Sequence, residues 1–368
     1  MGHQHQGEID EKQRRVNEFL ELGGYDALLL ARLENFAWFT CGGDCHVNIA
    51  QETGVAAVLV RRDRKTFITN AVERGRMLEE ELAGQGFEEE INPWTANDLR
   101  STLTRVAPGE KIAADVALPG VTACPADIAR LRQSLTPEEV ERLRGLGADV
   151  GAAIGEVATM VERGMTEHDA AAAIASQHLS RGVTPIVVLV AADDRLLKYR
   201  HPIPTDNPIH RTVMLVVCGR RGGLIVSATR LVHFGGFPDD LRARHQAVVE
   251  VDAAFIAGTQ VGTRIGDIFT AGLDAYAAHG FPEEWKLHHQ GGPAGYVARE
   301  YRATADSNDQ VVPYQVFAWN PSITGTKSED TIMATPGGPE IVSLSPGFPT
   351  IDVKVGDRVF PRSDILSR

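Results

Sequence analysis

The sequence contains little cysteine for its length. Its 368 residues include four cysteines, Cys41, Cys45, Cys124 and Cys218. None of their spacings forms a CxxC pair or a zinc-ribbon pattern, and a chain this long needs no disulfides to complete its core. We therefore expect reduced thiols and a cytoplasmic protein.

The sequence also lacks long runs of positive charge and long apolar segments. The net charge is −12, and the short basic cluster from Arg61 to Lys65 is interrupted by Asp63, so we expect no nucleic-acid partner. The most apolar stretch, Ile186 to Ala192, is far too short to span a bilayer, so we expect no membrane partner.

Residues 1–7 (MGHQHQG) are polar and lack the apolar core of a signal peptide. We expect them to be a cloned tag or a disordered tail. For that reason His3 and His5 are left out of the candidate site.

The length exceeds what one hydrophobic core usually serves, which favours two domains. In residues 8–134, helical and extended patterns alternate, which indicates an α/β domain. The helices are expected at Glu11–Leu22 and Met77–Ala83, and the strands at Tyr25–Leu30, Val55–Val60, Lys65–Ile68 and Ile112–Asp115. The charged turn at residues 61–64 makes the two middle strands a hairpin.

The second domain is expected to span residues 135–368. Thr136, Pro137 and the two following acids are typical of a helix start, and apolar residues then recur every three or four positions up to Val161. Thr166 opens a further helix that reaches Gly182. Beyond it we expect strands at 186–190, 213–218, 224–226, 315–319 and 331–334, interrupted by helices at 239–258 and 265–279.

Several short motifs, in this order, resemble the creatinase, prolidase and aminopeptidase-P family. They are Asn35–Gly43 (NFAWFTCGG), Leu135–Val140 (LTPEEV), Gly164–Glu167 (GMTE), Thr229–Arg230, His289–Gly292 (HQGG) and Ser328–Thr331 (SEDT). The resemblance covers nearly the whole chain. It implies an α/β (α+β) fold, with a creatinase-like N-terminal domain and a C-terminal pita-bread domain of two similar halves, and commonly a homodimer.

Metal-dependent members of that family hold two divalent cations with two aspartates, a histidine and two glutamates. Such carboxylate density offsets the repulsion between two hard cations. The resemblance places these ligand positions, in chain order, at Val217, Ser227, His289, Asn320 and Glu329. Only the histidine and the last glutamate are retained, so we expect no cofactor. A single divalent cation held weakly by His289 and Glu329 is the less favoured alternative.

Creatinase, which has the same fold, works without a metal and uses a histidine for proton transfer. The resemblance places that histidine at His201, where an imidazole can act as general acid and base near neutral pH. We expect Glu329 to raise the pKa of His201 and orient its ring. His288 and His289 are neighbours, so only one is expected to face the site from a strand, and His289 is preferred. The expected catalytic residues are His201, His289 and Glu329, and the substrate contacts are Tyr296, Asn320, Arg299, Ser227 and Arg230.

The leading interpretation is a metal-independent hydrolase of a C–N bond in a small amide, amidine or amino-acid derivative. Arg299 and Arg302 are suited to an acidic group on that substrate, since guanidinium groups pair well with carboxylates. Three alternatives remain open. They are an Xaa-Pro metallopeptidase with altered ligands that acts on a short peptide, a non-catalytic ligand-binding protein, and a lyase or cyclisation step that uses the same groups.

Overall fold

The computed structural model describes residues 6–96 and 98–368, and it divides into two compact units. The first unit comprises the chain up to Glu139 together with residues 222–224, and the second comprises Val140–Arg221 and Ile225–Arg368. The sequence had suggested a division after residue 134. His3 and His5 lie outside the described residues, whereas Gln6 and Gly7 belong to the first helix.

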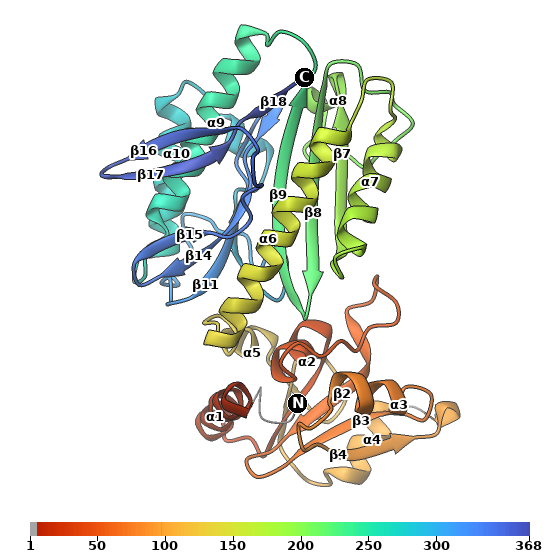
Figure 1. The fold of residues 1–368 in the computed structure, drawn as a ribbon. Helices are drawn as coiled ribbons and strands as arrows, with labels where there is room; N and C mark the ends of the chain where they lie inside the picture. Colours follow the sequence, from red (N-terminus) through yellow and green to blue (C-terminus); the bar gives the residue numbers. More distant parts are fainter. Residues whose placement is uncertain (1–5, 97) are drawn as a thin grey trace. The chain divides into compact units, whose positions relative to one another are not determined.

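The first unit contains a six-stranded mixed sheet with strand order β4-β3-β2-β1-β5-β6. Figure 1 labels β2, β3 and β4 of this sheet. The strand β2 is antiparallel to both β1 and β3, which confirms the predicted hairpin. The elements, in chain order, are α1 (Gln6–Gly23), β1 (Ala27–Arg32), α2 (Leu33–Phe39), β2 (Thr53–Val60), β3 (Lys65–Asn70), α3 (Arg74–Arg76), η1 (Met77–Glu81), β4 (Glu88–Asn92), η2 (Trp94–Ala96), α4 (Leu99–Val106), β5 (Ile112–Ala114), β6 (Thr122–Ala123) and α5 (Pro125–Arg130).

The strand β1 begins two residues later than predicted. Tyr25 stacks on Phe19 of the preceding helix, with ring centroids 5.8 Å apart, and the Asp26 carboxylate accepts a hydrogen bond from the backbone N–H of Lys111. Both residues therefore belong to the turn that leads into the sheet, and the strand begins with the apolar run at Ala27.

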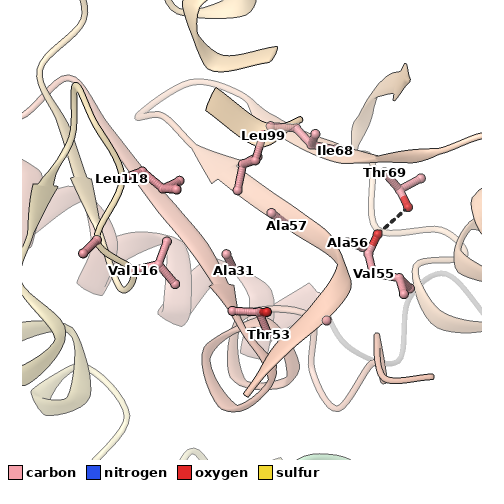
Figure 2. A pocket seen from close by; sticks show the side chains of 12 residues that line it. Ala31, Thr53, Val55, Ala56, Ala57, Ile68, Thr69, Leu99, Val116 and Leu118 are labelled. Atoms are coloured by element: carbon pink, nitrogen blue, oxygen red, sulfur yellow. Dashed lines mark hydrogen bonds between the residues drawn. The ribbon is translucent and has the colours of Figure 1, made fainter. Parts of the chain in front are cut away.

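A pocket of about 400 Å³ lies against the sheet of the first unit. Figure 2 shows its small side chains, including Ala31, Ala56 and Ala57, and the Thr69 hydroxyl that donates to the Val55 carbonyl. None of the lining residues in the described part of the chain titrates, so this pocket offers no acid or base.

The second unit is built around an eight-stranded sheet whose main path is β10-β11-β14-β9-β8-β7. Two further strands complete it, β15 beside β14 and β18 beside β9. The elements are α6 (Pro137–Met160), α7 (Glu167–Leu179), β7 (Thr184–Ala192), α8 (Asp194–Lys198), β8 (Thr212–Arg221), β9 (Leu224–His233), α9 (Asp239–Gly258), α10 (Ile265–Ala278), η3 (Glu284–Leu287), β10 (Gly291–Ala294), β11 (Gln315–Trp319), β12 (Ser322–Ile323), β13 (Thr326–Lys327), β14 (Asp330–Thr335), β15 (Gly338–Ile341), β16 (Thr350–Val355), β17 (Arg358–Ser363) and β18 (Ile365–Ser367).

The same succession of elements occurs twice in this unit. Two long helices and then three strands make up the first half (α6, α7, β7, β8, β9), and the second half repeats the pattern with α9, α10, β10, β11 and β14. The last strand of each half lies at the centre of the sheet, where Asp330 of β14 pairs with Ala228 of β9. The α/β (α+β) class and the two-part C-terminal domain implied by the resemblance are therefore confirmed.

Helix α6 approaches the chain segment 342–345 unusually closely. Gly147, Gly151 and Gly155 are spaced by four residues and so lie on one helix face. A Cβ atom on Gly151 would be 2.4 Å from the carbonyl oxygen of Leu344, and the Ser345 hydroxyl donates to the Gly151 carbonyl at 2.5 Å. The glycines permit this contact, which fixes the segment that supports the candidate site.

No helix within residues 6–96 and 98–368 has the length and apolar character needed to cross a bilayer.

Candidate functional site

Three histidine side chains meet in the second unit. The Nε2 atoms of His201 and His288 are 3.2 Å apart, and the His289 ring lies 5.6 Å from that of His201 and 4.6 Å from that of His288, measured between centroids. His201 is exposed, His289 is half-buried and His288 is buried. The geometry thus joins the two predicted histidines to a third.

A salt bridge holds the His201 loop against the segment that carries the other two histidines. Arg200 lies between α8 and β8, and its guanidinium donates to Glu284 of η3 at 2.6 Å and to the Thr324 hydroxyl at 3.0 Å. Glu284 also accepts from the backbone N–H of Thr324. This clamp places His201 beside the chain that leaves η3.

The expectation that only one of His288 and His289 faces the site is wrong. It assumed that both residues lie in a strand, where neighbouring side chains point to opposite faces. The strand β10 begins only at Gly291, and His288 directly follows the 3₁₀ helix η3. Outside a strand the alternation does not apply, and both rings turn toward His201.

Hydrogen bonds fix the orientation of His288. Its Nδ1 atom lies 3.3 Å from the Ser322 hydroxyl, and its Nε2 atom lies 3.5 Å from the Asn320 amide nitrogen as well as near His201. With the Asn320 amide in the orientation that the structure assigns, its nitrogen donates, which assigns the lone pair of His288 to Nε2 and the proton to Nδ1, facing Ser322. His201 then donates from Nε2 to His288, which leaves the Nδ1 lone pair of His201 free to accept a proton.

The Glu329 carboxylate is buried among protein cations. It accepts hydrogen bonds from Lys327 Nζ at 2.6 Å, from Arg299 Nη2 at 2.9 Å and from the Thr229 hydroxyl at 2.8 Å. Burial alone would raise the pKa of Glu329, but the charges of Lys327 and Arg299, with the hydrogen bonds from Lys327 and Thr229, lower it to about 2. Glu329 is therefore an anion whose charge is fully compensated by side chains.

The charge of Glu329 acts to raise the pKa of His201, as expected, but the net shift of that pKa is downward. Burial lowers that pKa, and the positive charge of Lys327 lowers it further, so the opposing effect of Glu329 is outweighed. Burial and neighbouring positive charges also lower the pKa of His288 to about 2 and of His289 to about 4. All three imidazoles are consequently neutral at neutral pH.

The three histidines line an open pocket of about 530 Å³. Arg200, Lys286 and Arg302 supply positive charge to it, and Phe269 and Trp285 supply aromatic surface. In the described part of the chain, no carboxylate is among the lining residues and Arg302 has no ion-pair partner. The pocket therefore suits a small anionic ligand.

The comparisons with known proteins decide the family. Residues 141–336, more than half of the chain, match the description "Metallopeptidase family M24". The chain belongs to this family. The description of that family is one of metallopeptidases.

One curated relative and several solved structures are similar to this M24 chain. An Xaa-Pro dipeptidase of Lactobacillus helveticus is 26% identical over 222 residues, which are 57% of this chain and 60% of that relative. The dipeptidase PepE of Mycobacterium ulcerans has a TM-score of 0.78 at 16% identity, with 98% of both chains covered. An Xaa-Pro dipeptidase of Bacillus anthracis has a TM-score of 0.77 at 16% identity, with 98% of this chain and 100% of that chain covered. The structural similarities show a shared fold.

The residues of this M24 protein do not fit the pair of divalent cations that the family resemblance implies. Val217 offers no ligand atom, and the Ser227 hydroxyl shares a hydrogen bond with Cys218 Sγ at 3.2 Å. Asn320 is neutral, and the Glu329 carboxylate is already occupied by Lys327 and Arg299. A pair of divalent cations would add four positive charges beside two side-chain cations that already share one carboxylate.

The remaining predicted substrate contacts lie in the protein interior. Arg230 is fully buried and donates to Asp330, to Ser345 and to the carbonyl of Ser343. Asp330 also binds Arg362, so this network anchors the residue that follows Glu329. Arg230 is thus a structural residue. Tyr296 is 2% exposed and is not among the residues that line the pocket.

Sequence reasoning missed His288 as a partner of His201, and it missed Lys327 altogether. Lys327 precedes Glu329 by two residues, a spacing that places two side chains on one side of an extended chain. That spacing was the available signal for their ion pair. His288 was missed because residues 288 and 289 were assumed to lie in a strand, where only one of the two side chains could face His201.

Proposed function

We propose that this M24 protein is a metal-independent hydrolase that cleaves a C–N bond in a small amide, amidine or amino-acid derivative. The supporting observation is the buried Lys327–Glu329–Arg299 cluster beside three neutral histidines. Side-chain cations balance the retained carboxylate, and the neutral imidazoles offer the lone pairs that proton transfer needs.

In this proposal, His201 is the general base and then the general acid. Its free Nδ1 atom accepts a proton from a water molecule, whose oxygen forms a bond to the substrate carbon. The C–N bond then breaks, and His201 returns the proton to the departing nitrogen. His288 holds the tautomer of His201 through Ser322 and Asn320.

The pocket supports a substrate with an acidic group. Arg302 is exposed and without an ion-pair partner among the described residues, whereas Arg299, the predicted contact, already binds Glu329. A carboxylate near Arg302 would gain a charge-assisted hydrogen bond. The Asn320 Oδ1 and His289 Nδ1 atoms are buried without protein partners in the described chain, and His289 lines the pocket.

The experiment removes metal before measuring activity. The protein is dialysed against a chelator, its metal content is determined by mass spectrometry, and it is assayed for release of free amine from a panel of acylated and amidino amino acids. We expect turnover at a metal content far below one ion per chain. The exchange His201→Ala should lower turnover by about 10²–10⁴-fold. The exposed His210→Ala is the matched control.

The competing interpretation is an Xaa-Pro metallopeptidase, which the family description and the name of the Lactobacillus relative favour. It requires activity to disappear with the metal and to return with Mn²⁺, Co²⁺ or Zn²⁺, on Xaa-Pro dipeptides. A binding protein without chemistry would give no turnover with any substrate. Four free thiols support the proposed cytoplasmic location, and a homodimer is proposed from the family resemblance.

A further inference from the structure

We propose that His201, His288 and His289 together bind one transition-metal ion of the Zn²⁺ type, and that this ion inhibits the enzyme. This site differs from the pair of metals that the family resemblance implies, because it uses none of the carboxylate positions and shares only His289 with them. The inhibition rests on the proposed function, whereas the binding does not.

The nitrogen atoms are already close to the spacing that such an ion requires. One potential ligand atom from each histidine lies within 4.8 Å of the other two. In a tetrahedral zinc site with Zn–N distances of about 2.0–2.1 Å, ligand nitrogens are about 3.3 Å apart. The Nε2 atoms of His201 and His288 meet this spacing at 3.2 Å. Rotation of the half-buried His289 ring would bring its ligand nitrogen to the third ligand position.

The surroundings match a three-histidine site with one open position. Ser322 accepts a hydrogen bond from His288 Nδ1, the outer contact that commonly orients a ligating imidazole, and it leaves Nε2 for the ion. The His289 Nδ1 atom has no protein partner in the described chain. All three rings line the 530 Å³ pocket, so an ion can enter and keep a water ligand.

The charges nearby favour a borderline ion over a hard one. Lys327 and Arg299 share the carboxylate of Glu329, and the site itself offers no anionic ligand. Mg²⁺, Ca²⁺ and Mn²⁺ prefer oxygen ligands, whereas imidazole nitrogens suit Zn²⁺, Co²⁺, Ni²⁺ and Cu²⁺. An ion bound to Nε2 of His201 leaves the ring proton on Nδ1, so the Nδ1 lone pair that the proposed proton transfer uses is no longer available.

The test measures binding independently of activity. The full chain carrying His3→Ala and His5→Ala, which removes the N-terminal histidines, is titrated with Co²⁺ and followed by the visible bands of tetrahedral cobalt. Calorimetry with Zn²⁺ gives the affinity. We expect one ion per chain, at least a tenfold weaker affinity in His201→Ala and about 10–100-fold weaker binding in Ser322→Ala. The exchange His210→Ala and titration with Mg²⁺ serve as controls.

His201 is exposed, so His201→Ala tests the site even if the buried His288→Ala does not fold. Equal Zn²⁺ affinity in wild type and His201→Ala, or no tetrahedral cobalt spectrum, would overturn the site. Zn²⁺ that binds and lowers turnover of the metal-free enzyme supports both proposals. Zn²⁺ that binds at these histidines and restores turnover to an inactive metal-free protein keeps the site but overturns metal-independent hydrolysis.

Discussion

Glu329 is a buried carboxylate whose neighbours decide its role. Lys327 and Arg299 are 4% and 14% exposed at their side chains, so neither can find another counter-charge in solvent. Removing one partner of a buried ion pair leaves an uncompensated charge, which is more costly than removing the whole pair. We therefore expect the three residues to behave as one unit in stability.

The exchange Glu329→Gln should destabilise the protein by about 3–5 kcal/mol, because Lys327 and Arg299 lose their shared anion. Urea unfolding measures this change. The double variant Lys327→Met/Glu329→Gln should recover part of the loss, since one stranded cation is removed with the carboxylate. If Glu329→Gln alone changes the unfolding free energy by less than about 0.5 kcal/mol, as an ordinary surface exchange does, the ion-pair assignment is wrong.

The same carboxylate predicts a pH dependence. Its pKa is about 2 in the folded protein, against an ordinary value of 4.5, so its stabilising contribution is fully present above pH 4.5. That contribution is lost as the pH falls from 4.5 toward 2. Unfolding measured across this range should show wild type and Glu329→Gln converging in stability as the pH falls. Parallel curves would contradict the lowered pKa.

Among the elements, helix α6 links the fold to the site. Its glycine face lies against residues 342–345, where Ser343 and Ser345 bind Arg230 and Asp330. Asp330 directly follows Glu329. A shift of this segment would therefore move the carboxylate that the site depends on.

The exchange Gly151→Ala should destabilise the protein by about 1–3 kcal/mol, because the new methyl group would lie 2.4 Å from the Leu344 carbonyl oxygen. Gly145→Ala is the matched control on the same helix. Gly145 is exposed, and a Cβ atom there meets nothing closer than 3.6 Å, so alanine should stabilise the helix by about 0.5–1 kcal/mol. Thermal unfolding of both variants measures whether the changes in stability have opposite signs. Equal changes in the two variants would refute the close contact at Gly151.

The sequence predicts the helices and strands better than it predicts the contacts of the candidate site. Helix α9 was predicted at its observed bounds, Asp239–Gly258, and the Thr166 start of α7 forms a capping box with Asp169, because local patterns specify both. The internal duplication was not visible in the sequence. The two halves repeat the order of their helices and strands, but their residues do not repeat. The ion pairs of Glu329 and the His201–His288 contact join residues far apart in the chain or outside regular strands, where no periodic pattern specifies a partner.

On the scale of the whole molecule, each unit has its own hydrophobic core. One apolar cluster draws on residues 27–121 of the first unit, and two others draw only on residues 187–365 of the second. All three histidines, with Lys327, Glu329 and the pocket, belong to the second unit.

A fragment comprising residues 135–368 should therefore unfold cooperatively and keep the Co²⁺ spectrum proposed above. Circular dichroism during heating and the cobalt titration measure the two properties on the same preparation. A fragment carrying Glu329→Gln is the matched control, and it should melt at a lower temperature. A fragment without a cooperative transition would show that the second unit requires the first for folding.

The pairing of Glu329 with two side-chain cations has a consequence for how the protein matures. Lys327 and Arg299 are part of the polypeptide itself. The negative charge of Glu329 is therefore neutralised as soon as the chain has folded. This ion-pair cluster itself therefore needs no metal-loading step. Under the proposed metal-independent hydrolysis, turnover would therefore continue when divalent ions are scarce.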